Sequence, residues 1–101
     1  MTLTNPMHIW FQYLWDQRQN EQGKIKCFEC GKWMTRNTWR DISTCYSHIL
    51  GRKKYPKYAG NSDNICIVHP DCHYLYTIKP SNAQNQFKLY LKLLEEINEL
   101  D

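Results

Sequence analysis

The chain has 101 residues, of which 42% are hydrophobic and 14% aromatic, and its formal net charge is +3. That composition excludes a disordered polypeptide, and the length favours a single domain over residues 1–101 whose small core needs support from a metal or from disulfides. No apolar stretch is long enough for a secretion signal or a membrane span, so we expect a cytoplasmic protein that does not contact membranes. In a reducing compartment, the five cysteines are expected to be metal ligands or free thiols.

The N-terminal segment has the pattern of an amphipathic helix. Asn5 and Pro6 suit the N-cap and the first helical position, and Gly23 is a natural stop. Apolar residues then recur at the spacing of one helical face, at Met7, Trp10, Phe11 and Leu14. We therefore predict a helix over residues 6–21 that serves as scaffold.

The middle of the chain is expected to form short strands around turns. Residues 24–27 alternate between polar and apolar, residues 44–50 are predicted to form a strand that carries His48, and residues 64–68 are β-branched and suit a returning strand. Between these last two strands, residues 51–62 form a loop with glycine and proline breakers.

Positive charge is concentrated in this middle part. Residues 24–57 hold nine of the thirteen lysine and arginine residues and only two acidic residues. A local positive field favours a polyanionic partner, such as nucleic acid. The basic residues of the predicted loop are Arg52, Lys53, Lys54 and Lys57.

Two helices are predicted after the returning strand. Pro70 suits the start of a short helix that carries Cys72 and His73. Ser81 or Asn82 can cap a final helix over residues 82–100. We expect one apolar face on that helix, made of Phe87, Tyr90, Leu91, Leu94 and Ile97.

Four residues have the spacing of a structural zinc site. The pair Cys27-x-x-Cys30 is followed by Gly31, which lets the backbone turn and point its amides at thiolate sulfur, and His69-x-x-Cys72 supplies a second pair. Soft thiolates favour Zn²⁺ over Mg²⁺ or Ca²⁺. Cys66-x-x-His69 has an equally acceptable spacing, and the first pair could instead be redox-active, although the βαβ context of such sites is missing.

The segment from Cys27 to His73 resembles the HNH endonucleases, also called ββα-metal or His-Me finger nucleases, and above all their small zinc-containing phage members. The matching stretches are Ser47-His48-Ile49-Leu50, Tyr55-Pro56, Asp63-Asn64-Ile65 and Cys72-His73. The resemblance implies an α+β fold with a zinc-stabilised ββα-metal core over residues 24–79, flanked by an N-terminal and a C-terminal helix. It also implies a phage-encoded protein in a bacterial host.

The resemblance further implies a role for each matching residue. His48 corresponds to the general base that takes a proton from the attacking water, Asn64 to the residue that pins the loop between the strands, and His73 to the ligand of a catalytic divalent ion. That ion is expected to be Mg²⁺, Mn²⁺ or another transition ion. The expected partner is DNA, although RNA also fits, and the basic loop is expected to contact its phosphates.

Some alternatives remain open at this point. Ser47 stands where active family members often carry Asp or His as a second metal ligand, which fits a non-catalytic zinc module that binds nucleic acid or a protein. His69 and His73 are spaced i,i+4 and could share one catalytic ion, in which case Cys66 could complete the zinc set. The outer helices could also form a homodimer.

Overall fold

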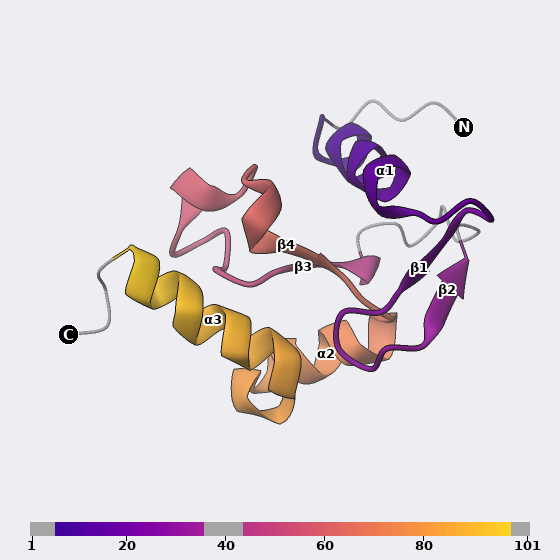
Figure 1. Cartoon of the computed structure of the whole chain (residues 1–101). Helices are drawn as coiled ribbons and strands as arrows, with labels where there is room; N and C mark the ends of the chain where they lie inside the picture. The colour runs from indigo at the N-terminus through magenta and orange to yellow at the C-terminus, as the bar shows by residue number, and fades with distance from the viewer. Residues whose placement is uncertain (1–5, 36–43, 98–101) are drawn as a thin grey trace.

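The computed structural model describes residues 6–35 and 44–97, and over these ranges the fold is α+β, as predicted (Figure 1). It contains two small antiparallel sheets, β1 (Lys24–Lys26) with β2 (Trp33–Thr35) and β3 (Tyr46–His48) with β4 (Ile65–Ile67). The helices are α1 (Pro6–Arg18), α2 (Pro70–Ile78) and α3 (Gln84–Glu96). Short 3₁₀ turns lie at η2 (Pro56–Tyr58), η3 (Ser62–Asn64) and η4 (Pro80–Asn82).

The sheet β3–β4 and the helix α2 form the centre of the molecule. His48 lies opposite Ile65 in this sheet, and Ser47 lies opposite Cys66. The sheet is tied to α2 by the Tyr76 hydroxyl, which donates a hydrogen bond to the carbonyl oxygen of Ile49 at the end of β3 (2.5 Å). This link places the end of β3 next to one face of α2.

The hydrophobic core surrounds this centre, and α1 covers part of it. The ring of Phe11 stacks on that of Tyr46 with centroids 4.2 Å apart. At the end of α1 the Arg18 guanidinium donates to the carbonyl oxygens of Ile65 (2.7 Å) and Ser62 (2.8 Å). It thereby ties α1 to the start of β4 and to the turn before it. The helix therefore acts as scaffold, as expected.

Helix α1 is shorter than the predicted span of residues 6–21. The chain leaves the helix after Arg18 because Asn20 closes a turn, in which its side-chain oxygen accepts hydrogen bonds from the amides of Gln22 and Lys24 (both 2.9 Å). Gly23, with φ +74°, lies inside that turn rather than at the helix end. The proposed cap Asn5 lies outside the described residues.

Helix α3 begins differently from the prediction. Ser81 and Asn82 belong to the 3₁₀ turn η4, and the N-cap residue Ala83 offers no side-chain hydrogen bond. The carboxylate of Glu29, far away in the sequence, instead accepts hydrogen bonds from the amides of Asn85 (3.0 Å) and Gln86 (2.9 Å). The helix is capped by tertiary structure, which a local sequence pattern does not reveal.

The buried face of α3 is partly rotated from the predicted one, of which Tyr90, Leu94 and Ile97 do pack in or against the core. Its fully or nearly buried residues are Gln86, Leu93 and Leu94, whereas Leu91 is 40% exposed. Gln86 takes a core position because its amide group donates hydrogen bonds to Glu29 Oε1 and to the carbonyl oxygen of Cys72. The predicted end of this helix, residues 98–100, is not described.

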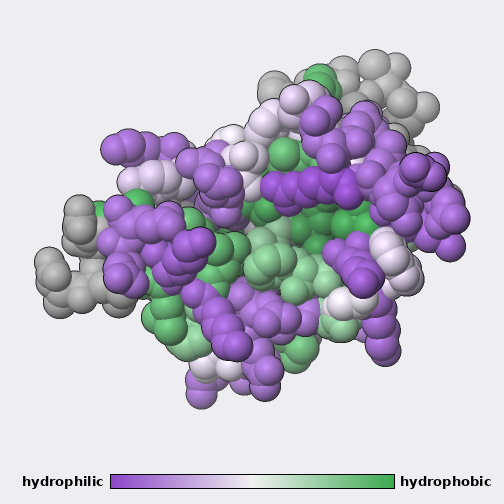
Figure 2. All heavy atoms as spheres, in the orientation of Figure 1, coloured by the Kyte–Doolittle hydropathy of each residue, from purple (hydrophilic) through white to green (hydrophobic). Residues whose placement is uncertain are grey.

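One face of the molecule is hollowed between α1, β1, β4 and α3. Figure 2 shows apolar side chains across the middle of this face, with hydrophilic side chains around them. The hollow has a volume of about 450 Å³, and its lining includes Ile25, Phe28, Ile67 and Leu89. In the described part of the chain, none of the helices is long and apolar enough to cross a membrane.

Candidate metal cluster and histidine pocket

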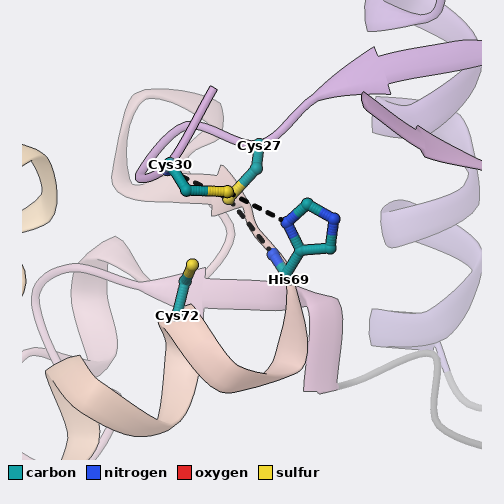
Figure 3. A group of neighbouring side chains, drawn as sticks. All are labelled: Cys27, Cys30, His69 and Cys72. Carbon is teal, nitrogen blue, oxygen red and sulfur yellow. Dashed lines mark hydrogen bonds between the residues drawn. The ribbon is translucent and has the colours of Figure 1, made fainter. Parts of the chain in front are cut away.

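The four residues predicted to bind zinc meet at one point of the structure. Cys27 and Cys30 lie in the loop that follows β1, His69 directly precedes α2, and Cys72 is in the first turn of α2. Figure 3 shows their side chains converging, and the four ligand atoms all lie within 4.8 Å of one another. A tetrahedral Zn²⁺ needs sulfur atoms about 3.8 Å apart. The group could therefore bind a metal such as zinc with small side-chain adjustments.

The backbone around Cys27 directs hydrogen-bond donors at its sulfur atom. The Cys27 sulfur accepts hydrogen bonds from the amides of Cys30 (3.4 Å) and His69 (3.3 Å). Gly31 makes the turn possible, since its φ of +77° is rarely adopted by other residues, and its amide donates to the carbonyl oxygen of Cys27 (2.9 Å). Amide groups that donate to sulfur are typical of thiolates that bind a metal ion, so the donor set fits zinc.

Cys30, at the exposed end of the cluster, and Cys72, at its buried end, differ in their pKa. Burial raises the pKa of the Cys72 thiol to about 12. At Cys30, burial acts in the same direction, but hydrogen bonds from the Lys32 amide and from Cys27 and Cys72 outweigh it, and the pKa lies below the ordinary value. A metal ion binding here has to displace a proton from Cys72, so its affinity falls as the pH falls.

The structure distinguishes between the alternatives that the spacing left open. Cys66 is buried on β4, outside the cluster, and burial raises its pKa to about 12. His69 instead belongs to the cluster, with its Nδ1 atom 3.3 Å from the sulfur of Cys30. His69 therefore belongs to the cluster, whereas His73 lines a separate pocket.

The other two predicted histidines lie together in a separate pocket. His48, at the end of β3, and His73, on α2, both line a pocket of about 340 Å³. The further lining residues are Ile49, Gly51, Lys54, Tyr55, Tyr76, Thr77, Pro80 and Tyr90. The pocket thus combines two imidazoles, a lysine and several tyrosines, a set suited to an anionic ligand.

The tautomer of His48 follows from its hydrogen bond. Its Nε2 atom lies 2.9 Å from the carbonyl oxygen of Ala59, and because a carbonyl can only accept, Nε2 carries the proton and Nδ1 keeps its lone pair. Burial lowers the pKa of His48 below its usual value, and electrostatic interactions with Arg52 and His73 lower it further, against the opposing effect of the Ala59 hydrogen bond. The ring is therefore neutral at pH 7 and able to accept a proton.

His73 is oriented in the same manner. Its Nδ1 atom lies 2.9 Å from the carbonyl oxygen of Thr44, so Nδ1 carries the proton and the lone pair is on Nε2. Histidine ligands of metals commonly donate their second ring nitrogen to a backbone carbonyl in this way. His73 therefore has the arrangement of a metal ligand through Nε2.

Asn64 holds the loop between the two strands. Its side chain is buried, and its Oδ1 atom accepts from the amide of Leu50 (2.6 Å), while Nδ2 donates to the carbonyl oxygens of Leu50 (3.0 Å) and Tyr58 (3.1 Å). The loop held in this way also contains Ala59, which orients His48. Asn64 thus controls the position of His48 through the loop backbone.

The four basic residues of this loop are exposed. Lys54 lines the pocket itself, and its Nζ atom lies 5.4 Å from the ring centroid of Tyr55. Lys57 has a similar position over Tyr58 at 5.7 Å. Arg52 acts electrostatically on His48, and Lys53 is exposed next to it in the chain.

Ser47 does not take part in the pocket. Its side chain is fully buried, and its hydroxyl has no hydrogen-bond partner among the residues that the structure describes. Because successive side chains of a strand point to opposite faces, Ser47 turns away from the side that presents His48.

Sequence reasoning missed several residues of these sites. Thr77 and Tyr76 follow His73 at helical spacing, and that periodicity could have identified them as pocket residues. Tyr90 reaches the pocket from α3, and Glu29 reaches α3 from the cysteine loop. No local sequence pattern predicts either contact.

Comparison with known proteins found no match for this chain. No family model matches the chain, no curated protein is similar to it, and no solved structure resembles it. The two sites are therefore characterised by their own geometry: a Cys₃His group that could bind a metal such as zinc, and a pocket that holds two imidazoles in defined tautomers.

Proposed function

We propose that the protein is a metal-dependent endonuclease of the HNH type that hydrolyses phosphodiester bonds in DNA. One observation supports this above all others: His48 and His73, from β3 and α2, line a single pocket, with free ring nitrogens on both. Asn64 fixes the connecting loop, and basic side chains stand beside the pocket. Strand, loop, strand and helix thus supply the residues in the order that an HNH site needs.

In this proposal His48 acts as general base. Its Nδ1 lone pair accepts a proton from the water that attacks phosphorus, while the Ala59 carbonyl holds the ring through Nε2. Because its pKa lies below the usual value, the basic form of the imidazole predominates at neutral pH. Lys54, which lines the pocket, and Arg52, which acts electrostatically on His48, would bind the phosphates next to the scissile bond.

His73 would hold a divalent ion through Nε2, with water and substrate oxygen as the other ligands. When bound, such an ion polarises the phosphate and stabilises the leaving oxygen. A nitrogen ligand suits Mn²⁺ or another transition ion better than Mg²⁺. The four cluster residues would hold Zn²⁺ away from the reacting atoms and clamp the start of α2 to the loop after β1.

The test is nicking of supercoiled plasmid in Mg²⁺, Mn²⁺, Co²⁺ and Ni²⁺. We expect cleavage with at least one ion and a loss of at least about 100-fold in His48→Ala, because general-base catalysis contributes that much. Tyr74→Ala is the matched control, since Tyr74 is adjacent to His73 but 65% exposed. Circular dichroism and zinc content verify that both variants are folded. Undiminished cleavage by His48→Ala would contradict the proposal.

A second function is favoured by Ser47. Because its hydroxyl is buried and directed away from the pocket, this position supplies no second ligand for a catalytic ion. That arrangement suits a zinc module that binds nucleic acid or a protein without cutting. Salt-sensitive DNA binding with no strand cleavage in any of the four ions would support this second function instead.

A further inference from the structure

The ribbon β1–β2 presents a basic and aromatic surface that the histidine pocket does not use. In both strands the middle residue is buried, and Ile25 pairs with Met34, so the flanking residues share the opposite, exposed face. That face, called the ribbon face below, consists of Lys24, Lys26, Trp33 and Thr35, with Lys32 next to it.

Trp33 is unusually accessible for such a large apolar side chain. It is 53% exposed, and Lys26, its direct partner across the ribbon, holds its ammonium group 5.2 Å from the ring centroid. The indole is thus held against the sheet by a cation on one side. A flat ring held in this way can stack on an unpaired base, because every base offers a π face.

The charge of the ribbon face points to a polyanion. Lys24, Lys26 and Lys32 are all exposed, and the acidic residue of this segment, Glu29, is engaged by the amides at the start of α3. Lys26 therefore lies over the exposed indole, Lys24 shares its face of the ribbon, and Lys32 directly precedes Trp33 in the chain. Interleaved lysines and an aromatic ring are the features of surfaces that bind single-stranded nucleic acid.

The ribbon face is separate from the basic loop. Figure 1 shows β1 and β2 on one side of the β3–β4 sheet and the segment with η2 and η3 on the other. A nucleic acid that contacts both must extend across the protein, whose longest dimension is 44 Å. The ribbon face therefore adds a contact at a distance from the histidine pocket rather than enlarging that pocket.

We infer that the ribbon face binds a single-stranded stretch of nucleic acid, with a base stacked on Trp33 and neighbouring phosphates paired with Lys24, Lys26 and Lys32. As a statement about substrate it rests on the proposed nuclease function: the preferred substrate has an unpaired segment beside the cleavage site. As a statement about binding it stands without cleavage.

The test measures binding by fluorescence anisotropy of a labelled single-stranded oligonucleotide and of the duplex of the same sequence. All proteins are zinc-loaded and carry His48→Ala, so that no substrate is cut. We expect Trp33→Ala to weaken single-strand binding about tenfold and duplex binding by less than twofold, because only an unpaired base can stack. Trp33→Phe should retain most of the affinity, and Tyr74→Ala, an exposed aromatic residue elsewhere, should change neither Kd.

Salt dependence tests the lysines separately. Each of Lys24→Gln and Lys26→Gln should reduce the slope of log K against log salt by about 0.7 for the single strand. An equal loss for single strand and duplex in Trp33→Ala, or no loss for either, would overturn the inference. Because binding and plasmid nicking are read separately, a protein that cuts DNA without any effect of Trp33 refutes only this inference. A protein that binds through Trp33 but never cuts refutes only the nuclease.

Discussion

Cys72 and His73 are neighbours in the chain, yet they belong to two regions of different character. Cys72 points into the sulfur cluster with Cys27, Cys30 and His69, whereas His73 lines the pocket with His48. The cluster is assembled from two pairs with short spacing, and its donors hydrogen-bond to one another. The pocket is assembled from a strand, a loop and two helices, and its rings are oriented by backbone carbonyls.

The comparison teaches that two consecutive positions of one helix can contribute to two different regions. Side chains at consecutive positions of a helix do not face each other, so α2 can contribute to both regions without bringing them into contact. We therefore expect the cluster to control whether the chain folds and the pocket to control what the folded chain does. The following predictions test that division.

Loss of the metal should have the largest effect. Structural zinc contributes about 10–16 kcal/mol of apparent binding free energy in small peptides, which matches or exceeds the net stability of about 5–15 kcal/mol of a whole domain. Chelation, or Cys72→Ser, should therefore abolish the cooperative thermal transition followed by circular dichroism. Cys66→Ala is the control: it removes a buried thiol outside the cluster and should lower the melting temperature while leaving one zinc per chain. A full thermal transition after chelation would contradict the expectation that the cluster controls folding.

Asn64→Ala should have the next largest effect and should act on the pocket rather than on the cluster. It leaves the amide and carbonyl of Leu50 and the carbonyl of Tyr58 without their partner, and we expect a loss of about 3 kcal/mol in the free energy of unfolding. Urea denaturation measures this loss. Asn61→Ala, which removes one exposed hydrogen bond in the same loop, should cost less than 1 kcal/mol. Zinc content should be unchanged in both variants.

Glu29→Ala tests the link from the cluster to α3. It removes the acceptor of the Asn85 and Gln86 amides, and loss of a helix cap costs about 1 kcal/mol. Glu95→Ala, on the exposed side of the same helix, should have little effect on the urea midpoint. Equal midpoints for the two variants would show that the cluster loop does not stabilise α3.

The smallest effect concerns the protonation of His48 and should leave the cluster untouched. Its pKa is lowered first by burial and further by electrostatic interactions with Arg52 and His73. A base must be unprotonated, so the nicking rate should fall to half of its plateau value only at a pH below 6.5. Arg52→Gln removes one of these charges and should move the pKa of His48 upward, which an NMR titration of the imidazole measures. A pKa of His48 above 6.5 in the unmodified protein would contradict the structure.

Much of this architecture can be anticipated from local patterns. The α+β class, the helical face of α1 and the alternation in β1 depend on residues close in sequence, so periodicity identifies them. The cysteine pairs can be recognised because two-residue gaps alone allow both side chains of a pair to reach one ion. The resemblance to HNH nucleases likewise predicts His48, Asn64 and His73 as site residues.

Other features were decided by tertiary structure alone. The spacing allowed either Cys66 or His69 as a zinc ligand. The structure favours His69, because Cys66 lies opposite Ser47 inside the β3–β4 sheet and outside the cluster. The start of α3 at Gln84 depends on a carboxylate more than fifty residues away, and the rotated face of that helix depends on the same contact. The physical reason is that spacing reports only which side chains can meet. The packing of distant segments determines which of them are buried, hydrogen-bonded and aimed at the same place.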